Sequence, residues 1–284
     1  MSIDTGKLYI VSTPIGNLDD ITIRAIDTLK TVDIVAAEDT RRTRELLNHF
    51  NINTKVISFF EYSNDNKIDY IIDELKKGKN IALVSDAGTP IISDPGSRLI
   101  KALVDNDIEF TAIPGACAAI NAVVLSGLKV KAFTFIGFLP DDNKRRNDIL
   151  DYLSDKKETL IFYVSSHDLL SNLKTFIKVF SGERHASLSR EMTKKFEETV
   201  RGKLDFIYDY YKDKKILGEF VLVIEGLSDE EYNLKETNKW LNVDINEHYT
   251  FYINQGLTEK EAMKKVANDR GVGKSEIYKI LKVQ

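Results

Sequence analysis

The stretch NIALVSDAGTPIISDPG, residues 80–96, decides the fold class. Its apolar start is typical of a strand buried on both faces, and the Gly- and Pro-containing part that follows is typical of a loop after such a strand. A Gly-rich loop in this place commonly binds phosphate. Here, however, no Lys or Arg occurs from residue 80 to residue 97, and Asp86 and Asp94 would repel an anion. The loop therefore predicts a ligand without phosphate groups.

The same pattern of apolar runs extends over the first 118 residues. Amphipathic stretches with helical spacing separate the runs, and this alternation predicts a mainly parallel sheet covered by helices. The strands of this sheet are expected at 8–13, 32–38, 55–60, 80–86 and 109–115.

After a helix-like stretch at 117–127, a second set of apolar runs predicts a second α/β domain. Its strands are expected at 133–140, 159–166, 185–192 and 218–226, with helices at about 143–154, 168–180 and 203–212. An acidic stretch around Trp240 predicts a linker helix, and the last part of the chain predicts a helix-turn-helix with its break at Gly271. The predicted domains are 1–118, 119–228, 229–246 and 247–284.

Composition narrows the class of protein. The chain has 284 residues, a net charge of −4 and one Cys. The single Cys excludes an internal disulfide and is typical of a reducing cytosol. No apolar stretch is long enough to span a bilayer, and the first residues lack the layout of a signal peptide. We expect a cytoplasmic protein that contacts nucleic acid, if at all, through local patches.

Three loops contain Gly or Pro and follow predicted strands: 12–20, 85–96 and 114–120. In an open α/β sheet the loops at the carboxyl ends of the strands meet in a ligand-binding crevice. None of the three loops holds Lys or Arg, and the dinucleotide motif G-x-G-x-x-G is absent. A neutral or cationic ligand therefore fits best. S-adenosylmethionine, which has a sulfonium cation and no phosphate, meets that description, although this argument alone does not name the ligand.

Several long motifs resemble one known family. They are LYIVSTPIGNLDDITIRAIDTLKTVDIVAAEDTRRTRELL at 8–47, SDAGTPIISDPG at 85–96 with IPGACAAI at 113–120, and SREMTKKFEETVRG at 189–202. Together they resemble the tetrapyrrole-methylase-fold family from Leu8 to about Gly226. More narrowly they resemble its ribosomal branch, which methylates the ribose 2′-oxygen of a decoding-centre cytidine in bacterial small-subunit ribosomal RNA.

The resemblance implies two α/β domains with a cofactor cleft between them, followed by a small C-terminal helix-turn-helix domain. It also implies S-adenosylmethionine as the cofactor. The matching cofactor-binding positions are Pro14, Asp86, Ala87, Gly88, Thr89, Ser93, Ala116, Ala118, Phe162, Tyr163, Leu188 and Ser189. The implied partners are 16S ribosomal RNA within the 30S subunit and a second copy of the chain, with no membrane and no DNA.

Two alternative functions stay open. Relatives that modify tetrapyrroles carry G-x-G-P-G-D after the first strand, whereas this chain has STPIGN, with Asn17 in place of Asp. That difference favours the RNA-methylating branch over a precorrin-type methylase. The other alternative, a DNA-binding regulator, requires polar base-contacting side chains on the last helix. KSEIYKIL at 274–281 offers few of them.

The acidic pair Glu38 and Asp39 ends the second predicted strand. Methylation of a hydroxyl needs a base for a weakly acidic proton. In the relatives an acidic residue aligned with Glu38 lies near the methyl group, so Glu38 is the first candidate base and Asp39 the second. The alternatives are an ion pair of Glu38 with Arg41 or Arg42, and an N-cap role for Asp39.

Cations beside the predicted cleft are candidate RNA contacts because guanidinium groups bind phosphate as bidentate forks. They are Arg41, Arg42, Arg44, Lys144, Arg145, Arg146, Lys194 and Lys195. The alternative for 144–146 is a solvated helix start. The resemblance also breaks down in FYVSSHDL at 162–169, where Val164 and Asp168 depart from the branch's pattern. For His167 this favours a local polar or substrate-edge position over a functional role.

Three other patterns in the sequence do not indicate a functional site. GVGKS at 271–275 lacks the first Gly of a P-loop and a preceding strand. Cys117 lies among small residues without a His partner and is interpreted as buried filler. The four His residues are scattered without ligand spacing, so no metal site is expected.

Overall fold

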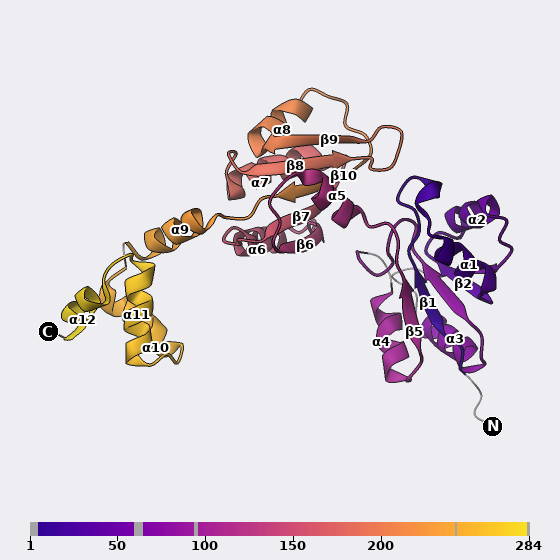
Figure 1. Cartoon of the computed structure of the whole chain (residues 1–284), viewed down its shortest axis with the longest axis horizontal. Helices are drawn as coiled ribbons and strands as arrows, with labels where there is room; N and C mark the ends of the chain where they lie inside the picture. Colours follow the sequence, from indigo (N-terminus) through magenta and orange to yellow (C-terminus); the bar gives the residue numbers. More distant parts are fainter. Residues whose placement is uncertain (1–4, 60–64, 94–95, 242, 283–284) are drawn as a thin grey trace. The chain divides into compact units, whose positions relative to one another are not determined.

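The computed structural model describes residues 5–59, 65–93, 96–241 and 243–282 (Figure 1). Asp94, part of the loop analysed above, and Phe60, the last residue of a predicted strand, lie outside the described residues. The chain divides into two compact units, Met1–Asp141 with Leu160–Ile224 and Asp142–Thr159 with Glu225–Gln284. This division differs from the boundaries expected at 118, 228 and 246, which stay predictions. Among the described helices, none is long and apolar enough to cross a membrane.

The first sheet of unit one is parallel, as the apolar runs predict. Its strands are β1 (Leu8–Val11), β2 (Ile34–Ala37), β3 (Lys55–Ser58), β4 (Ile81–Val84) and β5 (Phe110–Ile113), in the order β3-β2-β4-β1-β5. β2 and β4 are buried along their whole length, whereas the edge strands β3 and β5 are partly exposed. Because all five strands run in one direction, the loops after β1, β2, β4 and β5 emerge at the same edge.

Four helices cover the two faces of this sheet: α1 (Ile23–Thr31), α2 (Thr40–His49), α3 (Asp65–Lys76) and α4 (Ser97–Asp105). Alternate strand residues point to opposite faces. On one face, Leu8 and Leu83 pack with Ile71 of α3 and Leu99 of α4. On the other face, Val35 and its neighbours pack with residues of α1 and α2. A short 3-10 turn, η1 (Leu18–Asp20), precedes α1.

The second sheet of unit one has the order β6-β7-β10-β8-β9. Its strands are β6 (Phe133–Phe138), β7 (Thr159–Ser165), β8 (His185–Arg190), β9 (Glu198–Lys203) and β10 (Glu219–Ile224). β10 is antiparallel to β7 and β8, and β8 is antiparallel to β9. The predicted helices are present as α5 (Ala118–Ser126), α7 (Leu169–Phe180) and α8 (Leu204–Tyr211). β9 is absent from the sequence prediction.

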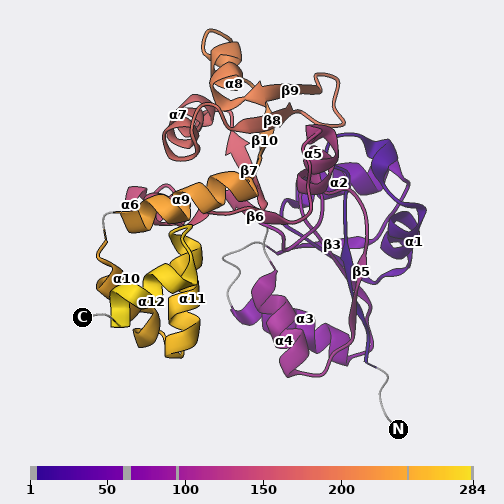
Figure 2. The same ribbon diagram turned by 60° about the vertical axis from the view of Figure 1, so that its left-hand side comes forward.

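Unit two consists of helices: α6 (Asn143–Leu153), α9 (Asp229–Leu241), α10 (Ile245–Asn254), α11 (Glu259–Asp269) and α12 (Lys274–Lys282) (Figure 2). α11 begins with a capping box between Thr258 and Glu261. Gly271, with φ +64°, makes the break before α12. Residues of α10, α11 and α12 share one hydrophobic core. The predicted helix-turn-helix and the helix around Trp240 are therefore confirmed as secondary structure.

His248 of α10 is the centre of a buried polar cluster in unit two. Its ring stacks on Trp240, with the ring centroids 3.5 Å apart. Arg270 donates from Nε to His248 Nδ1 over 3.1 Å, and Asp269 Oδ2 lies 3.4 Å from His248 Nε2. Tyr252 donates its hydroxyl hydrogen to the same Asp269 carboxylate. Burial first, and then the Arg270 charge, lower the pKa of His248 from 6.5 to about 4.

This cluster predicts that unit two loses stability in mild acid. Between about pH 6.5 and about pH 4, the unfolded chain binds a proton at His248 that the folded chain does not. The stability that unit two gains from keeping His248 uncharged is therefore fully present above the pKa of His248 in the unfolded chain. It is lost as the pH falls through this window. Trp240 is the one tryptophan of the chain. Its fluorescence during urea unfolding at about pH 7 and about pH 5 measures the loss.

His248→Phe is the matched variant, because a phenyl ring keeps an aromatic partner for Trp240 and does not titrate. The expected result is a smaller difference between the two pH values than in the wild type. Equal pH dependence in both proteins would contradict the prediction.

Candidate active site

The loops after β1, β4 and β5 meet at the carboxyl edge of the first sheet, as predicted. Thr13 N–H donates to Gly88 O over 2.8 Å, and Gly88 N–H donates to Thr13 O over 3.0 Å. The hydroxyls of Ser12 and Thr89 are 3.0 Å apart, and Thr89 also donates to Ala116 O over 3.3 Å. These hydrogen bonds tie the three loops into one surface.

Gly88 is required by this arrangement. Its φ of +79° lies in the left-handed region, which side chains disfavour. A Cβ at this position would lie 3.2 Å from Ile15 Cγ2. In the same loop, Ile91 (φ +78°) and Ser93 (φ +64°) hold left-handed conformations without being glycine. Backbone strain of this kind costs about 1–3 kcal/mol per residue and gathers at functional sites.

A pocket of about 350 Å³ lies in unit one beside these loops. A volume of this size is within the range of small-molecule sites. One side is formed by the three loops and the other by the second sheet. Its lining residues are Ile15, Ala87, Gly88, Thr89, Ile92, Ser93, Cys117, Ala118, Phe138, Tyr163, Val164, Ser165, Ser166, Glu191, Met192, Lys194, Gly218, Glu219, Phe220 and Val221.

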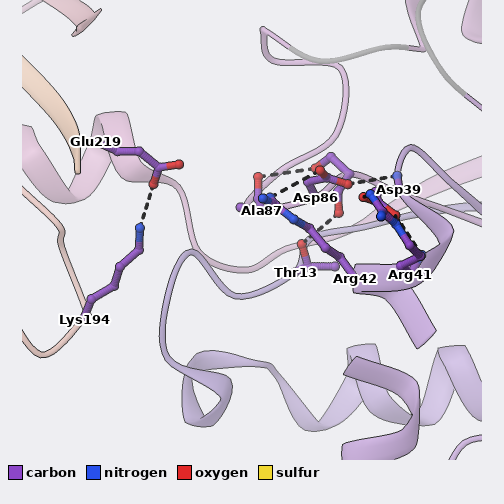
Figure 3. Close-up of polar contacts among 9 residues, drawn as sticks. Thr13, Asp39, Arg41, Arg42, Asp86, Ala87, Lys194 and Glu219 are labelled. Carbon is purple, nitrogen blue, oxygen red and sulfur yellow. Dashed lines mark hydrogen bonds and ion pairs between the residues drawn. The ribbon is translucent and has the colours of Figure 1, made fainter. Parts of the chain in front are cut away.

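Two carboxylates and one ammonium group are the charged side chains among the described residues of this lining. Lys194 Nζ donates to Glu191 Oε1 over 2.9 Å and to Glu219 Oε2 over 2.8 Å, and Figure 3 shows the second of these contacts. The cation is thus already neutralised by carboxylates. A pocket with this charge disfavours phosphate and accepts a neutral or cationic ligand.

The acidic turn after β2 lies beside the loop after β4 (Figure 3). Asp39 N–H donates to Asp86 Oδ1 over 3.0 Å, and Arg42 donates to Asp86 Oδ2 over 3.3 Å. Asp39 is the N-cap of α2, which confirms that alternative, and it accepts from Arg41 N–H over 2.8 Å. The Arg41 guanidinium and backbone lower the pKa of Asp39 to about 2. Glu38 is half-buried at the end of β2.

The structure brings half of the predicted cofactor residues to the pocket. Ala87, Gly88, Thr89, Ser93, Ala118 and Tyr163 line it, whereas Pro14, Asp86, Ala116, Phe162, Leu188 and Ser189 do not. Phe162, Leu188 and Ser189 are fully buried, and the Asp86 carboxylate faces the turn after β2. Cofactor binding by all twelve residues stays a prediction. His167 is exposed and outside the lining.

The predicted RNA contacts fall into three groups. Arg41 and Arg42 form exposed ion pairs with Asp39 and Asp86, and Lys194 lines the pocket. Arg44 and Lys195 are exposed in unit one. Lys144, Arg145 and Arg146 lie in the first turn of α6 in unit two, where Asp142 caps the helix by accepting from Arg145 N–H over 2.9 Å. That cap confirms the helix start expected as the alternative for 144–146.

The wall formed by the second sheet contains residues that the sequence did not reveal. Glu191 follows β8, and Glu219 begins β10. One local signal precedes them: Gly218 has φ +99°, and a Cβ there would lie 2.6 Å from Glu191 Cγ. A glycine directly before an apolar strand can thus indicate a close approach between segments.

The sequence is similar to one protein family and to named bacterial proteins. The family model for tetrapyrrole (corrin/porphyrin) methylases matches residues 7–207. A Halalkalibacterium halodurans protein named ribosomal RNA small subunit methyltransferase I is 46% identical over 277 residues, which are 98% of this chain and 95% of the relative. The Bacillus subtilis protein of the same name is 44% identical over 97% of this chain and 94% of its own length.

Solved structures of low sequence identity share the fold. The X-ray structure of cobalt precorrin-4 methyltransferase, a cobalamin biosynthetic enzyme, has a TM-score of 0.60 and 19% identity, covering 77% of this chain and 94% of that one. Uroporphyrin-III-C-methyltransferase from Thermus thermophilus has a TM-score of 0.56 and 18% identity, covering 78% and 94%. At this identity the likeness concerns the fold alone.

Proposed function

Because this chain belongs to the tetrapyrrole methylase family, and within it to the ribosomal RNA small subunit methyltransferase I group, we propose that it methylates the ribose 2′-oxygen of a decoding-centre cytidine in 16S ribosomal RNA. The methyl donor in this proposal is S-adenosylmethionine. The observation that carries the proposal is the pocket at the carboxyl edge of the first sheet, next to the acidic turn after β2. Asn17, at the position where tetrapyrrole-modifying relatives carry Asp, supports RNA over a precorrin-type substrate.

The pocket fits S-adenosylmethionine in size and charge. Its volume of about 350 Å³ suits a ligand of that size, and its lining combines small residues with Phe138 and Tyr163. Glu191 and Glu219 favour the sulfonium and ammonium cations over a phosphate-bearing ligand. Bound there, S-adenosylmethionine supplies an electrophilic methyl group. The loop residues 87–89 line the pocket at a bend that Gly88 makes possible.

We propose Glu38 as the base that accepts the proton of the ribose 2′-hydroxyl. A positioned base contributes about 10²–10⁴-fold to such a reaction, provided that its pKa suits the working pH. Asp39, the other candidate, has a pKa of about 2 and is engaged as the cap of α2. Such a carboxylate is a weak base. Glu38 is half-buried at the neighbouring position.

We also propose that the substrate is RNA within the 30S subunit and that the enzyme works in the cytoplasm as a homodimer. The modest net charge of −4 supports a particle as the substrate, because a bare polyanion is usually bound by a strongly basic surface. Apolar side chains exposed on α5, Ile120 and Val124, support contact with a second copy. Arg44, Lys144, Arg145 and Lys195 are exposed and suited to phosphate contacts.

Methyl transfer to ribosomal particles tests the proposed function. Purified protein is incubated with radiolabelled S-adenosylmethionine and 30S subunits that lack the modification, with naked 16S RNA in parallel. The expected product is labelled, alkali-resistant 2′-O-methylcytidine from the 30S subunits. Label in naked RNA as well would remove the requirement for the particle. Binding of S-adenosylmethionine without label in either RNA would refute the RNA substrate, and precorrin-type tetrapyrroles would then be tested.

A further inference from the structure

Lys194 connects three segments that form the pocket wall. Its ammonium group contacts Glu191, which follows β8, and Glu219, which begins β10. Its aliphatic stem lies against Gly16 in the loop after β1, where a Cβ would be 2.4 Å from Lys194 Cγ. Lys194, Glu191 and Glu219 all line the pocket, together with Ile15. One side chain therefore joins the loop after β1 to the second sheet.

The Glu191 carboxylate is itself held in place by the backbone of Glu219. Glu191 Oε1 accepts from Glu219 N–H over 3.0 Å, and Glu191 N–H donates to Glu219 O over 3.0 Å. The Glu191 side chain is only 18% exposed, and that of Lys194 is 30% exposed. Burial alone would lower the pKa of Lys194, but hydrogen bonds to Glu219 and Glu191 raise it overall. The ammonium group is therefore charged and has two carboxylate partners, of which Glu191 is the more buried.

The segment that carries Lys194 is strained. Glu191 (φ +49°) and Thr193 (φ +67°) adopt left-handed conformations although neither is glycine. Strained residues persist only where surrounding contacts hold them. Here Lys194 N–H donates to Glu191 O over 3.0 Å, and Thr193 N–H donates to Glu197 Oε2 over 2.6 Å. Together with the two ion pairs, these contacts hold the segment in this conformation at the pocket.

Lys195 offers a direct comparison. It has the same charge and the next position in the chain, but it is exposed and outside the pocket lining. An RNA phosphate would have to compete with two carboxylates for Lys194, whereas Lys195 projects from the surface. The sequence predicted an RNA contact for both residues, whereas in the structure only Lys194 lines the pocket.

We propose that Lys194 is a positioning residue of the S-adenosylmethionine pocket and does not contact RNA. It joins the loop after β1 to Glu191 and Glu219, so that the pocket is preformed before the cofactor binds. A preformed pocket avoids the free-energy cost of ordering its walls upon binding. This inference rests on the proposed function for the identity of the ligand.

The test compares Lys194→Met with Lys195→Met in the full-length chain. Methionine keeps an unbranched stem over Gly16 and removes the ammonium group. Calorimetry with S-adenosylmethionine in the absence of RNA is expected to show about three- to tenfold weaker binding for Lys194→Met, since Glu219 is 82% exposed and exposed ion pairs are weak. Lys195→Met is expected to bind the cofactor like the wild type. Lys194→Arg, which keeps the charge, is expected to restore part of the affinity.

Kinetics distinguishes positioning from general loss of structure. For Lys194→Met we expect a raised KM for S-adenosylmethionine, an unchanged KM for 30S subunits and a melting temperature near that of the wild type. Cofactor affinity equal to the wild type, or a raised KM for 30S subunits alone, would overturn the inference. A wild-type protein that is folded but binds no S-adenosylmethionine would instead refute the proposed function, and the inference with it.

Discussion

Glu38→Gln is expected to lower kcat about 10²–10⁴-fold while the affinity for S-adenosylmethionine stays unchanged. The amide keeps the shape of the side chain at the end of β2 but accepts no proton at neutral pH. Because the pocket lining does not include Glu38, cofactor binding has no reason to weaken. Single-turnover methylation of 30S subunits measures the chemical step, and calorimetry measures the affinity.

Asp39→Asn is the control for this experiment. An Asn side chain can still cap α2, whereas the ion pair with Arg41 is lost. We therefore expect a much smaller effect on kcat than that of Glu38→Gln. If Asp39→Asn had the larger effect on kcat, the roles assigned to the two acidic residues would be reversed. Equal activity of Glu38→Gln and the wild type would exclude Glu38 as the base.

Gly88→Val is expected to abolish useful binding of S-adenosylmethionine. The substitution places a branched side chain at φ +79° and directs it into contact with Ile15, whose Cγ2 is 3.2 Å from the Cβ position. Overpacking costs about 1–3 kcal/mol. If the cofactor can bind only against this overpacked surface, a penalty at the upper end of that range corresponds to about 100-fold weaker binding. Backbone strain of about 1–3 kcal/mol also lowers the melting temperature.

Gly256→Val separates these two causes. Gly256 also has a left-handed backbone, with φ +87°, and belongs to unit two. Its own chain neighbours aside, no atom of the described residues lies within 4 Å of a Cβ built there. The Gly256→Val substitution therefore introduces backbone strain without filling the pocket. We expect a lowered melting temperature and unchanged cofactor affinity. Weakened cofactor affinity in Gly256→Val would show that strain, and not the pocket, explains the result at Gly88.

The first sheet could be predicted because each of its strands is a short apolar run that ends in turn-forming residues. β9 could not be predicted in this way. Its sequence, ETVRGK, contains one buried side chain, Val200, and its strand character comes from pairing with β8. Such pairing depends on tertiary contacts more than on local propensity. The antiparallel register of the second sheet could not be predicted from the sequence either.

The pocket residues that the sequence predicted and those that it did not differ in the same way, by local pattern against tertiary pairing. The loops after β1, β4 and β5 carry Gly and Pro and could be predicted from the sequence. Glu191 and Glu219 come together because β8 and β10 pair with Arg190 opposite Phe220, which no local pattern shows. In β7, Tyr163 lines the pocket, whereas its neighbour Phe162 is fully buried and packs on Phe176 of α7.

The order of the strands has a consequence for synthesis on the ribosome. β1 pairs with β4 and β5, so the first sheet can close once β5 has been translated. The pocket, however, also needs residues of β10, up to Val221. A small molecule stabilises only the conformation that binds it. The nascent first sheet must therefore persist through its own two hydrophobic cores, and the cofactor can stabilise the chain only after β10 has emerged.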